Sequence, residues 1–195
     1  LQSLPALAET FFQPECGATA CKCPLRPAGQ ARAADDGLPR RLRHLYQVGL
    51  LGVIRGHSDP IHVSLMQRAA ERMLALTGGG AAGEYWWLLR GVLEGFANGA
   101  LLPGRARLRA LSRGDAMFRD YLRHPELRDE LVSPELREEM LGLVARAGAG
   151  ARASEIRARA GMIAVVLDDA QLEEERARLL GVSTEALEAM VAQRA

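Results

Sequence analysis

The positions of the prolines constrain this chain most. From residue 38 onward there are five prolines, and each stands where a helix can begin: Pro39, Pro60, Pro103, Pro125 and Pro134. The first turn of a helix tolerates proline because the N–H that proline lacks would have no partner there, whereas a helix interior does not tolerate it. The spacing therefore predicts a succession of helices over the larger part of the chain.

The first 37 residues follow a different pattern. Pro5, Pro14, Pro24 and Pro27 recur about every ten residues, which is too often for a long helix. We predict one short helix over residues 4–12 and an extended segment over the remainder of residues 1–37. The chain begins with leucine and shows no signal-peptide pattern, so we expect it to be a piece of a longer protein.

Apolar residues recur at helical spacing after residue 38. They predict helices over residues 39–55, 60–76, 83–97, 103–123, 125–132, 134–147, 152–167, 169–180 and 184–193. Gly49 and Gly52 cost about 1 kcal/mol each inside a helix, so we expect another helix to approach closely there. Gly78–Gly80 is predicted to be a flexible connection. Residues 162–167 also resemble a buried strand, but no second strand is available to pair with them, and a helix is favoured.

These patterns predict an all-α protein in three parts. Residues 1–37 form an extended Pro-rich N-terminal segment, residues 38–147 a helical bundle, and residues 151–195 a smaller C-terminal helical unit. The chain is 48% hydrophobic and 25% charged, as globular domains are. It contains no apolar run of about 18 residues, so we expect no membrane insertion. A net charge of +1 creates no general attraction for nucleic acid.

Candidate chemistry is sparse. His44 suggests a phosphotransfer histidine, but such domains resemble one another in an H-x-x-K-G stretch, and the lysine position here holds Gln47 or, in a looser spacing, Val48. Cys16, Cys21 and Cys23 match no common zinc pattern, and free thiols are the simplest interpretation. We therefore predict no catalytic residue, no cofactor and no metal site.

A helix-turn-helix motif is a further alternative for the C-terminal helices. Residues 179–187, LLGVSTEAL, resemble its turn, because a glycine makes the bend and a serine can cap the second helix. The exposed face of that second helix would carry Thr184, Glu185 and Glu188. Acidic side chains there would oppose DNA phosphates, so an ordinary helical corner is the favoured interpretation.

Three adjacent aromatic residues, Tyr85, Trp86 and Trp87, form the most unusual local feature. Neighbouring residues on a helix point about 100° apart, so the three cannot share one narrow face. We predict that the face bearing Trp86 packs against Gly49 and Gly52. Tyr85 or Trp87 then remains for a partner, because aromatic residues are enriched at interface hot spots. The alternative, which is favoured, places one tryptophan in the core and packs the other against an adjacent helix.

Several stretches together resemble one known family. Arg43–Gly56, RHLYQVGLLGVIRG, resembles a helix of the form LYQ-x-GLLG-x-x-RG, and Tyr85–Trp87 resembles an LWW helix. Phe11–Glu15, followed by prolines, is similar to an aromatic-x-Pro-acid entry segment, and Ile156–Arg176 resembles a later helix and an Arg-rich one after it. These are features of the FimL scaffold family, itself similar to the N-terminal region of ChpA-type chemosensory kinases. Residues 165–168 depart from the family pattern in lacking its glycine.

The resemblance implies a non-enzymatic region, similar to phosphotransfer bundles that have lost their histidine. It implies a role in coupling polar landmark proteins such as FimV to type IV pilus chemosensing, adenylate cyclase activity and twitching motility. Protein partners, a cytoplasmic location and a place at the cell pole follow from the same resemblance. A phosphotransfer-type domain of a chemosensory histidine kinase is the main alternative, and a DNA-binding regulator is the lesser one.

Overall fold

The computed structural model describes residues 37–57, 59–162 and 178. The predicted helix at 4–12, the extended segment up to residue 36 and the three cysteines lie outside these residues. So do the possible strand from residue 163 onward and nearly all of the two C-terminal helices with their helix-turn-helix resemblance. None of the described helices is both long enough and apolar enough to cross a bilayer.

The described part of the chain is all helical, which confirms the predicted fold class. Its elements are α2 (Leu38–Ile54), α3 (Ile61–Thr77), α4 (Gly80–Ala97), α5 (Arg105–Arg123), the 3-10 turn η1 (Pro125–Leu127), α6 (Pro134–Ala145) and α7 (Ala151–Arg159). Proline begins several of these elements as predicted. In α6, Ser133 also caps the helix by accepting a hydrogen bond from the Leu136 N–H. Two predicted helices are much shorter than expected: residues 125–132 form only η1 with turns, and α7 ends at residue 159. The helices predicted over 103–123 and 134–147 are each two residues shorter.

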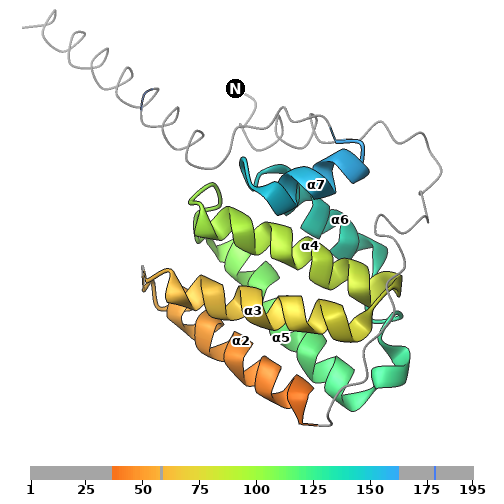
Figure 1. The fold of residues 1–195 in the computed structure, drawn as a ribbon. Coiled ribbons are helices and arrows are strands. Elements are labelled where there is room, and N and C mark those ends of the chain that lie inside the picture. The colour runs from red at the N-terminus through yellow and green to blue at the C-terminus, as the bar shows by residue number, and fades with distance from the viewer. Residues whose placement is uncertain (1–36, 58, 163–177, 179–195) are drawn as a thin grey trace, which may run out of the picture.

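Figure 1 shows α4 in the middle of the molecule, with α2 and α3 on one side of it and α6 and α7 on the other. Helix α2 packs against α3 and α5, and α3 packs against α4. Helix α4 also packs against α6 and α7. This arrangement places α2 at the outer edge of the bundle, so one side of α2 faces away from the other described helices.

Helix α7 belongs to the same core as the bundle. Its side chains Ala153 and Ile156 are fully buried in the cluster that includes α4. Gly91 allows this contact, because a Cβ there would lie 2.5 Å from the Ile156 Cδ1 atom. The core therefore shows no break between residues 147 and 151, where the bundle was expected to end. The remainder of the predicted C-terminal unit is outside the described residues, and the division into units stays a prediction.

The glycine triplet is not simply a flexible connection, because α4 already begins at Gly80. Gly80 has a φ of +80°, a value that favours glycine. Asp129 lies against it and accepts a hydrogen bond of 2.8 Å from the Ala82 N–H. A side chain at residue 80 would meet the Asp129 carboxylate at 2.5 Å. The start of α4 thus depends on an aspartate 47 residues away in the sequence.

Candidate interaction surface

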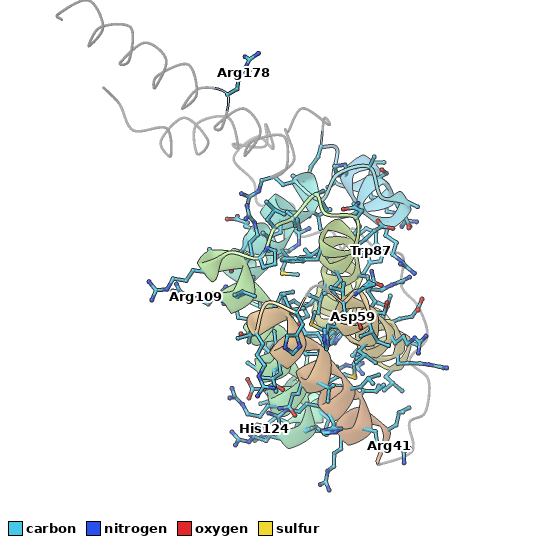
Figure 2. All side chains as sticks on the ribbon, turned by 90° about the vertical axis from the view of Figure 1, so that its left-hand side faces the viewer. Arg41, Asp59, Trp87, Arg109, His124 and Arg178 are labelled. Carbon is cyan, nitrogen blue, oxygen red and sulfur yellow. The ribbon has the colours of Figure 1, made fainter. Side chains whose placement is uncertain are left out.

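The two residues predicted to bind a partner, Tyr85 and Trp87, are both buried. Their exposed fractions are 1% and 6%, close to the 1% of Trp86. The Trp86 ring packs against Phe118 of α5, with 4.6 Å between ring centroids. Trp87 lies next to α7 (Figure 2), where the Arg159 guanidinium sits 5.8 Å from its ring centroid. Partner binding by Tyr85 or Trp87 would need an exposed ring, and neither ring is exposed, so their binding role stays a prediction. The alternative, with one tryptophan in the core and the other packed against an adjacent helix, is confirmed.

The glycines of α2 do receive another helix, but that helix is α3 and not α4 as expected. A Cβ at Gly49 would meet Met66 Cγ at 2.8 Å and the His62 carbonyl oxygen closer still. A Cβ at Gly52 would collide with the His62 ring. The prediction of close approach is confirmed and the predicted partner is wrong. Helix α3 follows α2 through a short connection and packs directly on this face, so α4 has no access to the two glycines.

The inner face of α2 is also held by α5. The Tyr46 hydroxyl, fully buried, donates a hydrogen bond of 2.8 Å to the Leu111 carbonyl oxygen. Burial raises the pKa of the Tyr46 phenol well above its usual value, so it stays a donor. Gly114 leaves room for it, because a Cβ there would lie 2.7 Å from the Tyr46 Cζ atom.

A bidentate ion pair extends this attachment toward the N-terminal end of α2. Arg43 Nε and Nη2 donate to the two Asp115 carboxylate oxygens at 2.8 and 3.0 Å. The hydrogen bond to Asp115 raises the pKa of Arg43. Helix α2 is therefore fixed in orientation, and the side of it that faces outward is well defined.

We define the α2 outer face as Arg40, His44, Gln47, Val48, Leu51, Ile54 and Arg55, all of them exposed. Among the described residues six large hydrophobic side chains are exposed, and three of them, Val48, Leu51 and Ile54, are on this face at 43–48%. A fourth, Ile61, begins α3 at 53%. Apolar side chains gathered in one place on a protein surface commonly mark an interaction site.

His44 lies on the same face, one turn before Val48. It is exposed, as a phosphotransfer histidine must be, but no lysine stands beside it in the sequence. No group of three metal-binding side chains comes together within the residues that the structure describes. What α2 presents is one histidine, a stripe of apolar side chains and flanking arginines. Sequence reasoning missed this surface because it treated α2 only as the receiver of another helix.

The described chain is thus an all-α bundle with a buried central helix and one apolar helix face directed outward. It belongs to the FimL scaffold family, since residues 31–174 match the family described as FimL scaffold protein second domain. The chain is 33% identical over 186 residues to Scaffold protein FimL of Pseudomonas aeruginosa. That alignment covers 91% of this chain and 31% of the relative, so the chain spans about a third of the relative's length. No solved structure is significantly similar to it.

The family assignment confirms the resemblance drawn from residues 43–56 and 85–87. The further likeness to ChpA-type kinases stays a prediction. The family match begins at residue 31 and ends at residue 174, so it includes all of the described helices.

Proposed function

We propose that this chain is a non-enzymatic scaffold module of type IV pilus chemosensory and cyclic-AMP signalling. Two findings support the proposal: the relative bears the name scaffold protein, and the bundle presents the α2 outer face. The observation that carries it is the second, because a scaffold needs surface apolar groups that its own core does not use. A FimV-like polar landmark protein and components of the adenylate cyclase pathway are the proposed partners, in the cytoplasm at the cell pole.

The physical argument rests on what a partner gains at this face. Full burial of an aliphatic side chain is worth about 1.5–3 kcal/mol. Val48, Leu51 and Ile54 are each 43–48% exposed. A partner that covers all three therefore gains a fraction of this free energy from each side chain. The attachment of α2 through Tyr46 and Arg43 means that this face is already ordered before a partner arrives.

The test uses the parent protein in cells and the chain in solution. Deletion of residues 37–162 from the parent is expected to abolish twitching motility and to lower cyclic AMP. The control is Leu127→Glu, which changes an exposed apolar residue in η1, far from α2 in sequence. This variant is expected to leave motility and cyclic AMP unchanged. In solution, binding of the chain to the cytoplasmic region of a FimV-like protein is measured by calorimetry. Unchanged motility and cyclic AMP in the deletion strain would contradict the proposal.

The second candidate is a phosphotransfer domain that uses His44, and the exposure of His44 on α2 favours it. Incubation with an active chemosensory kinase and labelled ATP separates the two. Under the scaffold proposal no acid-labile, base-stable label appears on the chain. Label that appears on the wild-type chain and disappears in His44→Gln would establish phosphotransfer instead.

A further inference from the structure

We infer that the α2 outer face binds an acidic amphipathic helix of another protein. This inference rests on the proposed scaffold function and adds the chemistry of the partner. The face has two parts: an apolar stripe toward the C-terminal end of α2, and an arginine at each end of the face, Arg40 and Arg55.

The apolar stripe has the size of a helix-docking surface. Val48, Leu51 and Ile54 are each three residues apart and extend over about 9 Å of α2 at 1.5 Å per residue. Ile61, the first residue of α3, is a further exposed apolar side chain. A partner helix that carries apolar residues at successive i, i+3 and i+4 positions covers such a stripe with one face.

The charge on α2 itself has one sign. Residues 38–56 contain four arginines and one histidine but no aspartate or glutamate. Arg40 stands in the first turn of α2, where the helix dipole favours an acid, and the first turn contains none. Arg55 follows the other end of the stripe. An acidic partner is attracted at both ends and also relieves the unfavourable position of Arg40.

Two acids near α2, within the part of the chain that the structure describes, form hydrogen bonds inside the chain. Asp115 accepts both hydrogen bonds from Arg43. Asp59, in the connection after α2, accepts a hydrogen bond of 2.8 Å from the Ile61 N–H. Neither of these two carboxylates forms an ion pair with Arg40 or Arg55. Carboxylates of a partner can form ion pairs with both arginines.

A second copy of the chain is a poor occupant. If two α2 helices pair antiparallel through this face, Arg40 of each copy approaches Arg55 of the other. If they pair parallel, each of these arginines approaches its own equivalent. Residues 38–56 supply no acid to offset either arrangement, and like charges across an interface suppress association.

Helix α5 offers a contrasting basic surface. Arg105 and Arg109 are exposed on it, and Arg109 projects outward in Figure 2. Arg113 and Arg119 are ion-paired with Glu139 and Asp120. No large exposed hydrophobic side chain is found within α5. It therefore supplies charge without the apolar anchors that dominate binding energy, and α2 is the better docking surface.

The experiment selects binders without assuming their sequence. A displayed library of randomised helical peptides of about 20 residues, long enough to cover α2, is panned against the full 195-residue chain. We expect the selected pool to be enriched in Asp and Glu over Lys and Arg. We also expect its binding to weaken at least about tenfold in Leu51→Glu, and severalfold in Arg40→Glu and Arg55→Glu and at high salt.

Two matched controls carry the same chemical change elsewhere. Leu127→Glu places an acid at an apolar residue of similar exposure in η1, and Arg109→Glu reverses an exposed charge on α5; both are expected to bind the pool as the wild type does. The inference is overturned if the pool is not acidic, if no pool is selected, or if Leu51→Glu binds it equally well. It is also overturned if the wild type is a dimer and Leu51→Glu a monomer. None of these outcomes changes the result of the deletion test in cells. Failure of the docking inference can therefore be told apart from failure of the proposed scaffold function.

Discussion

Helices α2 and α4 are both rich in apolar residues, but the bundle uses them in opposite ways. Helix α4 is covered by α3, α6 and α7 and buries 13 of its residues, including Glu84. Among the described helices, α2 packs mainly against α3 and α5, and its outward side retains Val48, Leu51 and Ile54 at the surface. The helix with the largest aromatic side chains is therefore core, and the helix with smaller aliphatic ones presents the surface.

The difference shows that the apolar content of a helix does not by itself locate a binding site. What matters is how much apolar surface remains after the neighbouring helices have packed. Glycine contributes to this result in both helices. Gly49 and Gly52 bring α3 close to α2, while Gly91 and Gly95 of α4 admit Ile156 and Ala147. Close packing on one side of α2 thus coexists with an open side, whereas α4 is packed on both.

The largest expected effect comes from the tryptophans of α4. Trp86→Ala should destabilise the fold by about 3–5 kcal/mol, and Trp87→Ala by about 3 kcal/mol, because truncation of a buried aromatic ring leaves a cavity. Urea unfolding followed by circular dichroism measures both. A cost below about 1 kcal/mol for Trp87→Ala would show that α4 has a side the core does not need. The contrast between α4 and α2 would then fail.

A smaller effect is expected from the glycines that join α2 to α3. Gly49→Ala should cost about 1–3 kcal/mol, since the added methyl group would overlap Met66 and the His62 backbone. The matched control is Gly142→Ala within α6, where a Cβ meets no atom within 4 Å. That change should stabilise the protein by up to about 1 kcal/mol because alanine is the better helix former. Thermal melts of the pair check both signs, and equal behaviour would refute the close-packing argument.

The attachment of α2 to α5 is tested by Tyr46→Phe. Loss of the hydroxyl removes the hydrogen bond to the Leu111 carbonyl and leaves that buried acceptor without this donor, which should cost about 1–2 kcal/mol at neutral pH. Denaturant unfolding measures the difference. A neutral effect would mean that the ring alone holds this side of α2.

The same tyrosine contributes to stability in a pH-dependent way. Burial raises the pKa of Tyr46 and that of Tyr85 above the usual value of 10.0. Their stabilising contribution is therefore complete below pH 10 and is lost as pH rises above it, because the unfolded chain releases protons that the folded chain retains. Between about pH 10 and 11 the wild type should lose stability more steeply than Tyr46→Phe, by up to about 1.4 kcal/mol per pH unit. Parallel pH profiles would contradict this assignment.

The smallest effect on stability is expected on the α2 outer face. Leu51→Gln should change the free energy of unfolding by no more than about 0.5 kcal/mol, because its side chain is already 46% exposed. Leu50→Gln is the matched control one position away, where 8% exposure predicts a much larger loss. Chemical unfolding of the two variants compares the two sides of one helix. Similar losses would mean that Leu51 supports the fold and is not reserved for a partner.

Much of the secondary structure was predictable from local chemistry. The prolines at positions 39, 60 and 134 lie at or next to the start of α2, α3 and α6, because proline is accepted only there in a helix. The need for a close neighbour at Gly49 and Gly52 was predictable as well. The use of Asp129 at the start of α4 was not, since no local pattern reveals a cap supplied from 47 residues away.

The sequence by itself determined that the described chain is all helical and roughly where each helix begins. It also revealed family membership through residues 43–56 and 85–87. Only the tertiary structure decided which faces are covered. Helical periodicity defines a stripe of residues, but the number of neighbours that a helix has depends on its place in the bundle. Because α4 is central and α2 lies at the edge, Trp87 is core and Leu51 is surface.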